Sequence, residues 1–402
     1  MSAGLPDIGN AKLSPRLRVA YQRMTIAMNV VPSVKPLKGL EEIRDRFQNL
    51  HEIVAAARAK LDRNIWDYLI GGVETETTVR RNRLALDSLA FRPRILRNVN
   101  STDASAKFLK RTFKMPVALA PIGSIERFDP AATAAVANAA GTFGCPMFQS
   151  SVSKPEPEET AKEVPDGLKI FQLYVRGDQA WVEAIFDRVV AAGFGALCLT
   201  VDTHHYSRRE RDISKRYHAA SARSPEHALH QKSLDWAQFD KIRAKYKLPL
   251  ILKGIATAED AKLAVEHGVD VIYVSNHGGR QLDHGLGTID MLPEVVAATA
   301  GRAEIMIDGG FCRATDVVKA IALGADMVCV GRLYGFGMAV AGRDGIFRVL
   351  ELLHDEMGRT MGLLGVNRLD ELDPSYVRAA PPVRPPHVLS AFPYVDAPDD
   401  RY

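Results

Sequence analysis

From about residue 117 to residue 331, short apolar runs alternate with longer stretches that are rich in alanine and have helical character. The apolar runs end in, or are followed by, glycine and polar residues, which is typical of buried strands. Eight such strand-and-helix units, over a length near the roughly 250 residues of a TIM barrel, predict a (β/α)8 barrel of the α/β class. A doubly wound open sheet is the alternative. The eight predicted strands are residues 117–120, 146–149, 169–173, 196–200, 250–253, 271–274, 304–308 and 327–331.

Local signals mark the ends of two predicted helices. Residues 257–260, Thr-Ala-Glu-Asp, combine a capping hydroxyl with acidic residues in a first turn, so they predict a helix that runs to Glu266 and closes at Gly268. Thr315 and Asp316 predict the start of a second helix, which Gly324 stops.

Three segments lie outside the repeat. Residues 1–40 form an N-terminal extension, and the apolar spacing of residues 40–69 predicts helices packed beside the barrel. The insertion at about 204–237 is long for a loop of this fold and rich in Arg, His and Ser, so we expect a lid or substrate loop on the active-site side. Residues 379–402 contain six prolines and predict an extended arm. The predicted barrel domain therefore spans residues 41–378.

Composition narrows the classes of function. The chain has 402 residues, of which 47% are hydrophobic and 25% charged, as in an ordinary globular protein. Its net charge of +4 comes from 52 basic and 48 acidic residues, a balance that favours an anionic small ligand over nucleic acid. The four cysteines lack short paired spacings, which argues against a disulfide framework or zinc site and for a reducing, cytoplasmic compartment. We expect no membrane span.

The polar ends of the predicted strands carry the candidate chemistry. In a parallel barrel all strand carboxyl ends meet on one face, where the active site lies. Hydrogen-bonding groups and glycines therefore collect on one rim, in the order Pro121-Ile122-Gly123, Ser150-Ser151, Gln172 with Tyr174, Thr200 with Asp202, Lys253, Ser275 with His277, Asp308-Gly309-Gly310 and Gly331-Arg332.

Residues 275–283 are the most informative of these ends, because they read Ser-Asn-His-Gly-Gly-Arg-Gln-Leu-Asp. A histidine and an arginine on glycine-rich backbone just past a strand is a combination that packing alone does not require. The glycines after the last two strands occupy the positions where such barrels often bind phosphate, which Arg332 or Arg313 could neutralise. These features predict an active site beside a phosphate site.

Together these motifs resemble the FMN-dependent 2-hydroxy-acid oxidase and dehydrogenase family, which includes glycolate oxidase, lactate oxidase and mandelate dehydrogenase. The likeness covers most of the chain and implies FMN as cofactor and oxidation of an (S)-2-hydroxy acid to the 2-oxo acid. Further matching segments are Asp-Tyr at 67–68, Phe-Arg-Pro-Arg at 91–94, Phe-Gln-Leu-Tyr at 171–174, Thr-Val-Asp-Thr at 200–203, Arg-Arg-Glu at 208–210 and Leu-Lys-Gly at 252–254.

The resemblance assigns the catalytic and substrate-binding residues. His277 is similar to the family's base, a task that suits an imidazole because it titrates near neutrality. Asp202 resembles the carboxylate that orients this base. Arg280 and Arg209 are similar to the arginines that hold the substrate carboxylate, although Arg208 is an alternative to its neighbour. The order of proton removal from oxygen and from carbon stays open.

Two tyrosines and a lysine complete the implied chemistry. Tyr68 and Tyr174 match tyrosines whose hydroxyls reach the substrate's carboxylate and reacting oxygen. Lys253 would favour negative charge on the reduced flavin. The implied cofactor-binding set is Pro121, Ile122, Gly123, Ser150, Gln172, Thr200, Lys253, Ser275, Asp308, Gly309, Gly310, Arg313, Gly331 and Arg332.

The sequence also departs from the family pattern. Cys312 stands where relatives usually carry an arginine, so one positive charge near the phosphate is missing. Val152 replaces a large aromatic residue of some members and Gly123 a frequent alanine, which predicts a roomier pocket and a substrate side chain larger than that of lactate. The pair at 204–205, His-His, replaces the usual proline, but no third ligand at useful spacing supports a metal site.

Three functions agree with these observations. The first is oxidation of a 2-hydroxy acid, with oxygen or another electron acceptor reoxidising the flavin. The second is oxidation of an amine or a modified amino acid or peptide at the same flavin site, and the third is a flavin-binding barrel without turnover. The family tendency to tetramers and the proline-rich arm predict a homo-oligomer.

Overall fold

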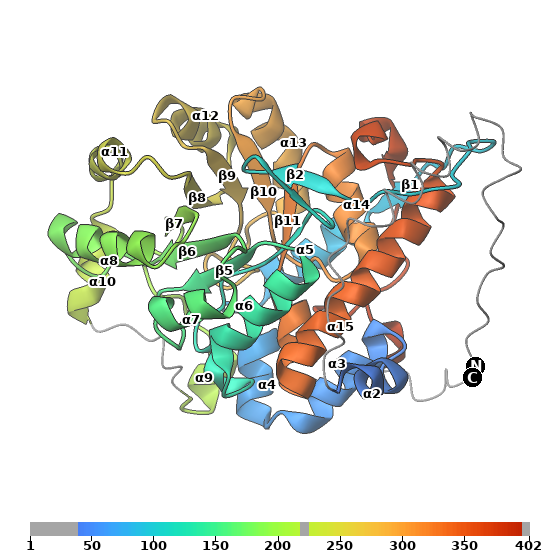
Figure 1. The fold of residues 1–402 in the computed structure, drawn as a ribbon, viewed down its shortest axis with the longest axis horizontal. Helices are drawn as coiled ribbons and strands as arrows, with labels where there is room; N and C mark the ends of the chain where they lie inside the picture. Colours follow the sequence, from blue (N-terminus) through green and yellow to red (C-terminus); the bar gives the residue numbers. More distant parts are fainter. Residues whose placement is uncertain (1–38, 218–224, 396–402) are drawn as a thin grey trace, which may run out of the picture. The chain divides into compact units, whose positions relative to one another are not determined.

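The structure, a computed structural model, describes residues 39–217 and 225–395. Eight parallel strands close into a barrel in the order β10-β11-β4-β5-β6-β7-β8-β9 (Figure 1). The closed order confirms the predicted TIM barrel and excludes the open sheet. The strands are β4 (Val117–Leu119), β5 (Met147–Ser150), β6 (Lys169–Leu173), β7 (Ala196–Thr200), β8 (Leu250–Ile255), β9 (Val271–Val274), β10 (Glu304–Ile307) and β11 (Met327–Val330).

Nearly every strand residue is buried, because side chains fill the barrel from inside and helices cover it from outside. Phe148, Tyr273 and Met306 belong to the inner cluster. The hairpin of β2 (Ala106–Phe108) and β3 (Arg111–Phe113) adds two phenylalanines to the same cluster. In the turn of this hairpin, the N–H of Leu109 donates to Glu304 at the start of β10. The hairpin therefore packs at the amino-terminal end of the strands, opposite the predicted active site.

Helices between the strands form the outer layer (Figure 1). The Thr257 hydroxyl accepts from the N–H of Asp260, which confirms the predicted start of α12. The next predicted helix, α14, begins one residue before Thr315, because the Asp316 carboxylate accepts from the N–H groups of Cys312 and Arg313. The layer consists of α6 (Ala132–Phe143), α7 (Pro157–Glu163), α8 (Gln179–Ala191), α11 (Trp236–Lys245), α12 (Ala258–Glu266), α13 (Thr288–Thr299), α14 (Ala314–Ala322) and α15 (Arg332–Leu364).

The helices predicted before the barrel are present. Asn49 caps α3 (Leu50–Lys60), which packs against α15. The others are α2 (Leu40–Arg46), α4 (Arg63–Ile70) and α5 (Thr77–Asp87). Residues 1–38 of the predicted extension lie outside the described residues.

The insertion and the tail differ in detail from the expectation. The insertion contains α9 (Glu210–Ser214) and α10 (Pro225–Lys232), and the start of α11, rather than a plain loop. At the tail, β12 (Val377–Ala379) pairs with β1 (Leu89–Phe91). The arm is not extended throughout, because η4 (Pro393–Val395) is a 3-10 turn and Leu389 and Phe392 are buried.

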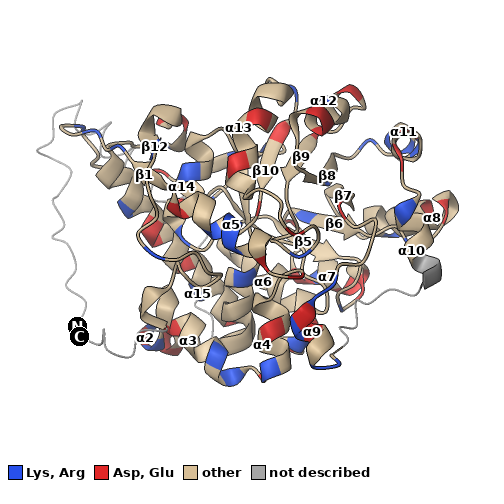
Figure 2. Ribbon diagram, turned by 180° about the vertical axis from the view of Figure 1, so that it is seen from behind, with Lys and Arg blue, Asp and Glu red and all other residues tan. Residues whose placement is uncertain are grey.

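Surface charge follows the balanced composition. Acidic and basic segments are interspersed over the helices around the barrel (Figure 2). No helix within the described ranges is both long and apolar enough to cross a bilayer. The four cysteines are buried free thiols.

Candidate active site

A cavity at the carboxyl ends of the strands brings together residues that are far apart in the sequence. Loops after seven of the eight strands and two segments outside the barrel contribute to it. The predicted site residues among its lining are Tyr68, Pro121, Ile122, Gly123, Tyr174, Arg209, Lys253, His277, Arg280, Asp308, Gly309, Gly310, Gly331 and Arg332.

The backbone after β9 adopts an unusual conformation at the cavity. His277, Gly278 and Gly279 have φ values of 60°, 63° and 76°, in the left-handed region that costs energy for a residue with a side chain. A Cβ atom on Gly279 would lie 2.7 Å from the backbone nitrogen of Val79, so this position needs glycine. The His277 N–H donates to Ser275 Oγ at 3.1 Å. The surrounding structure thus holds a strained histidine in place, as is frequent at functional sites.

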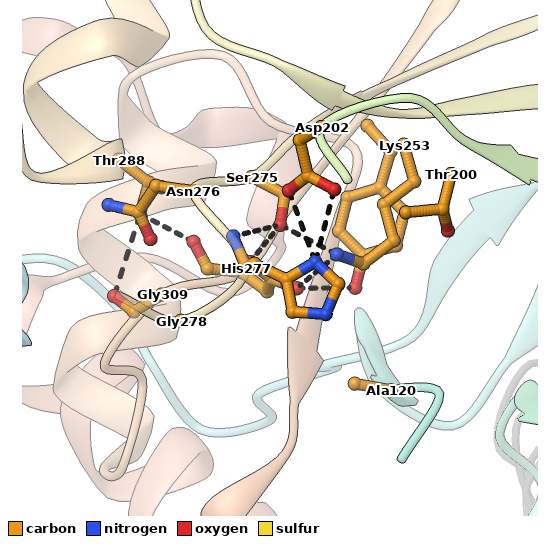
Figure 3. A network of polar contacts seen from close by, with 12 residues as sticks. Ala120, Thr200, Asp202, Lys253, Ser275, Asn276, His277, Gly278, Thr288 and Gly309 are labelled. Carbon is orange, nitrogen blue, oxygen red and sulfur yellow. Dashed lines mark hydrogen bonds and ion pairs between the residues drawn. The ribbon is translucent and has the colours of Figure 1, made fainter. Parts of the chain in front are cut away.

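The His277 ring links two other predicted residues, and Figure 3 shows its contact with Asp202. Its Nδ1 lies 3.1 Å from Asp202 Oδ1, and its Nε2 lies 3.2 Å from the Tyr174 hydroxyl. Burial lowers the pKa of His277, with Lys253 and Arg209 adding to this effect and Asp202 opposing it. Burial alone would raise the pKa of Asp202, but His277 and Lys253 lower it overall. The arrangement therefore pairs an ionised carboxylate with an imidazole that is neutral at pH 7 and can accept a proton.

Lys253 belongs to the same polar network, because Ser275 Oγ accepts from both Lys253 and the His277 N–H (Figure 3). Its ammonium donates to Ser275 Oγ at 2.9 Å and lies 3.7 Å from Asp308 Oδ2. Asp308 also accepts from Ser275 Oγ at 2.7 Å and from the Tyr273 hydroxyl at 2.9 Å. Burial would lower the pKa of Lys253, but Asp308 and Asp202 raise it. The lysine is therefore a fixed buried cation at the cavity wall.

Three predicted flavin-ring partners form a chain of hydrogen bonds across adjacent strands. Ser150 Oγ donates to Gln172 Oε1, and Gln172 Nε2 donates to Thr200 Oγ1, each at 2.8 Å. All three side chains are buried. They and Ser275 are not among the residues that line the cavity, so the chain forms the layer behind its wall.

The two predicted carboxylate-binding arginines both line the cavity. Arg280 donates to the carbonyl oxygens of Tyr68 and Gly71 at 2.8 and 2.7 Å, and its guanidinium lies 5.0 Å from the Tyr68 ring centre. Burial lowers the pKa of Arg280, and the charge of Arg209 lowers it further. The charge of Asp212 opposes this lowering. Two guanidinium groups that line one cavity suit an anionic ligand.

The structure distinguishes Arg209 from its neighbour. Arg208 is exposed and pairs with Glu210 at 3.2 Å. Arg209 is half-buried, lines the cavity, and has a buried Nε without a hydrogen-bond partner in the described residues. The geometry therefore favours Arg209. Tyr68 is buried and donates from its hydroxyl to the carbonyl oxygen of Gly123 at 2.8 Å.

The other end of the cavity has the features of an anion site. Gly309 and Gly310 have φ values of 110° and 87°, and Gly331 is the N-terminal cap of α15. Helix N-termini present free N–H groups that bind phosphate. Arg332 donates to the carbonyl oxygens of Leu69, Gly71 and Gly278, and so keeps its charge. These residues fit the phosphate of FMN, whereas the strip 121–123 on the same wall fits a flat ring.

Arg313 lies apart from this end of the cavity. Its Nη2 is 2.5 Å from Glu356 Oε1, and it is not among the lining residues. Arg313 is thus paired with Glu356, and its contact with the phosphate stays a prediction. The Cys312 thiol does line the cavity, and burial raises its pKa to about 11, so it is neutral at pH 7.

Sequence patterns did not identify several lining residues. Asn82 and Arg83 come from α5, where Asn82 exchanges two amide hydrogen bonds with Asn276, at 2.8 and 3.0 Å. Val388 comes from the C-terminal arm. In the sequence, only the adjacent polar residues Asn82 and Arg83, shortly before the matched segment at 91–94, could have indicated that α5 contributes to the site. No local pattern indicated Val388. Among residues 39–217 and 225–395, no three His, Cys, Asp or Glu side chains cluster as metal ligands would.

Comparisons with known proteins identify the family of the chain. A family model described as FMN-dependent dehydrogenase matches residues 57–379. Glycolate oxidase from Spinacia oleracea is 38% identical over 353 residues, covering 82% of this chain and 95% of that protein. L-lactate oxidase from Nostoc sp. is 35% identical over 355 residues, covering 82% and 97%.

Solved structures give the same result. A mutant of an active (S)-mandelate dehydrogenase chimera superposes with a TM-score of 0.78 and 30% identity, covering 82% of this chain and 99% of that one. Mandelate oxidase with 3,3-difluoro-2-hydroxy-3-phenylpropionic acid superposes with a TM-score of 0.77 and 36% identity, covering 83% and 100%. The chain therefore belongs to the FMN-dependent 2-hydroxy-acid oxidase and dehydrogenase family, whose cofactor is FMN and whose members are oxidoreductases acting on CH–OH groups.

Proposed function

We propose that this protein oxidises an (S)-2-hydroxy acid with a side chain larger than that of lactate, with His277 as the base. The observation that carries the proposal is the position of His277 Nε2, which faces the cavity 3.2 Å from the Tyr174 hydroxyl, while Nδ1 is engaged by Asp202. One imidazole nitrogen is thus anchored and the other can meet a substrate hydroxyl.

The substrate carboxylate is assigned to Arg280 and Arg209. A planar guanidinium can offer two parallel N–H groups to a carboxylate, which fixes the orientation of the α-carbon. With the carboxylate held there, the hydroxyl of the substrate faces His277 and Tyr174. His277 then takes the proton, and Asp202 stabilises the imidazolium that forms. Bound FMN supplies the acceptor for the electron pair that leaves the substrate.

The charged residues at the two ends of the cavity determine the orientation that we propose for the flavin. Residues 121–123 and Lys253 would hold the ring, and the ammonium would favour the negative charge of the reduced ring. Gly310, Gly331 and Arg332 at the start of α15 would hold the phosphate.

The larger substrate is inferred from two small residues in the lining. Val152 and Gly123 both line the cavity, on the side where Tyr174 and Arg176 also contribute. A valine in place of a large aromatic residue leaves room for a branched or aromatic side chain. The names of the mandelate enzymes among the similar structures agree with a substrate of that size.

Anaerobic reduction of the purified flavoprotein tests the function. We expect long-chain or aromatic 2-hydroxy acids to bleach the flavin absorbance faster than lactate or glycolate, and the matched 2-amino acids and amines to leave it unchanged. Bleaching by amines alone would favour the amine oxidation hypothesis, and a spectrum unchanged by both panels would favour a binding protein. Reoxidation by oxygen, compared with an artificial acceptor dye, separates oxidase from dehydrogenase.

A substitution tests the base directly. His277→Asn keeps a hydrogen-bonding side chain but cannot accept the proton, so flavin should remain bound while its reduction by substrate slows by at least about 100-fold. Reduction by dithionite, which needs no base, is the control and should be unaffected. Unimpaired reduction by substrate would remove His277 from the proposed mechanism.

A further inference from the structure

The cavity includes a residue from outside the region that defines the family. The family model matches residues 57–379, but Val388 lines the cavity together with Gly310, Cys312 and Arg83. Arg83 donates to the carbonyl oxygen of Gly310 at 2.8 Å, at the end assigned to the phosphate. The C-terminal arm therefore reaches the cofactor region, although the family match ends before it.

The arm is fixed to the surrounding helices by residues that follow Val388. Leu389 and Phe392 are 4% and 1% exposed, against 97% for Val383 earlier in the arm. The Phe392 ring packs edge-on against His51 and Phe336, with centroid distances of 5.8 and 6.4 Å. Such buried aromatic contacts hold the segment in one place rather than leaving it as a free tail.

Polar contacts link the same segment to residues around the phosphate end. Ser390 Oγ donates to Asp87 at 3.2 Å, and Asp87 pairs with Arg83. Arg313 Nη1 donates to the carbonyl oxygen of Ala391 at 3.4 Å. The arm thus contacts Arg83, which lines the cavity, through Asp87, and contacts Arg313, which does not line it, directly.

Those arginines carry little free charge for a phosphate. Arg83 is neutralised by Asp316 at 2.7 Å and by Asp87, and Arg313 by Glu356. Cys312 adds no positive charge, and its thiol is neutral at pH 7 because burial raises its pKa to about 11. Retention of the phosphate therefore depends on Arg332, on the helix N-terminus and on how well water is kept away from them.

We propose that residues 387–392 form a cofactor-binding segment of this chain, which closes the phosphate end of the FMN site. Excluding water strengthens the attraction between the phosphate and the N–H groups and guanidinium that face it. The proposal rests on the orientation of FMN given under the proposed function, and it is independent of the substrate.

Binding of FMN and riboflavin to the apoprotein tests the proposal, with flavin fluorescence as the readout. Val388→Asp places a negative charge beside the phosphate, so we expect the Kd for FMN to rise by at least about tenfold. Riboflavin lacks the phosphate, so its Kd should change by less than about threefold. Val383→Asp makes the same change at an exposed position of the arm and should leave both values as in the original protein.

The results of these binding experiments distinguish failure of this proposal from failure of the proposed orientation of FMN. An unchanged Kd for FMN in Val388→Asp would overturn the role of the arm. Equal weakening of FMN and riboflavin would overturn the assigned orientation of the cofactor. Val388→Ala, which removes apolar cover without adding charge, should accelerate FMN release by a few fold while the apoprotein keeps its melting temperature, and release at the original rate would count against the closing function.

Discussion

The Nδ1 atom of His277 lies 3.1 Å from Oδ1 of Asp202, which ties the ring of the proposed base to a buried carboxylate from another loop of the barrel rim. An ionised carboxylate at this distance accepts a hydrogen bond from Nδ1–H, so Nε2 is left as the basic nitrogen. The same carboxylate becomes more stabilising once the ring is charged. The pair therefore acts mainly after proton transfer has begun.

Asp202→Asn should show this in both rate and pH dependence. The pKa of His277 is lowered by burial and partly restored by Asp202, so removing the charge lowers this pKa further. The base is active when neutral, so kcat/KM falls below its pKa, and the acidic limb of the profile should move to lower pH. The plateau should drop by about 100-fold, because the imidazolium loses its counter-ion. A lower plateau with an unmoved limb would contradict the electrostatic coupling.

Adjacent arginines offer a matched pair of substitutions. Arg209→Met should raise the KM for 2-hydroxy acids and lower kcat/KM by about 10- to 100-fold, since a charged hydrogen bond contributes about 1.5–3 kcal/mol. Arg208→Met is the control, because Arg208 is exposed and pairs only with Glu210 on the surface. Its kcat/KM should stay within about twofold of the original. Steady-state kinetics with one substrate decides which arginine binds, and the reverse order of effects would reassign the carboxylate site.

Lys253 should set the redox potential of the flavin. Lys253→Met removes a buried ammonium and leaves Asp308 without its cation. Both changes disfavour an anionic reduced flavin, so the two-electron midpoint potential should fall by at least about 30 mV, the equivalent of about 1.4 kcal/mol. Spectroelectrochemical titration measures it. An unchanged potential would show that the lysine does not face the ring.

The barrel and most of its rim could be predicted because their signals are local. Each strand is an apolar run bounded by polar residues, and every predicted run overlaps an observed strand. Parallel strands bring their carboxyl ends together whatever their separation in the sequence, so His277 and Asp202 could be placed on one rim without knowing their distance.

Other parts of the site depend on docking that no local pattern encodes. Asn82 meets Asn276 only because α5 packs beside the loop after β9, 194 residues away. Arg313 follows the glycine turn as a phosphate ligand would, but its pairing with Glu356 on α15 could not be read from the local sequence. Val388 has an apolar side chain, so its sequence gives no sign of a functional role. Such contacts arise from tertiary packing.

Asp283 is the last residue of the segment 275–283, which contains His277. We expect it to affect stability rather than catalysis. Its carboxylate accepts from Thr75 Oγ1 at 2.6 Å, the Thr75 N–H at 3.0 Å and the Thr78 N–H at 2.8 Å. Burial would raise its pKa, but these hydrogen bonds lower it overall. Asp283→Ala should therefore lower the free energy of unfolding by about 1–3 kcal/mol in denaturant titrations at pH 7.

The pH dependence of that loss follows from the direction of the shift. A carboxylate whose pKa is depressed in the folded state stabilises the protein above its unfolded pKa of about 3.9, and this contribution disappears as pH falls through the folded pKa. The difference in stability between Asp283→Ala and the original protein should thus be constant from about pH 5 to 8 and shrink below about pH 4. A difference that grows on acidification would contradict the assignment.

Val152 should limit the size of the substrate. Val152→Phe restores the bulk of an aromatic residue at the cavity wall, so large 2-hydroxy acids should lose contact area or be excluded, whereas small ones still reach Arg280 and His277. We expect kcat/KM for an aromatic 2-hydroxy acid to fall by about 10- to 100-fold and that for lactate to change by less than about threefold, in line with the roughly 1–3 kcal/mol that a pocket can use to discriminate side chains.

The ratio of the two kcat/KM values in one preparation of Val152→Phe is the measurement, since it cancels differences in active flavin content. An equal fall for both acids would mean that Val152 affects the cofactor or the fold, and an unchanged ratio would place the side-chain pocket elsewhere in the cavity.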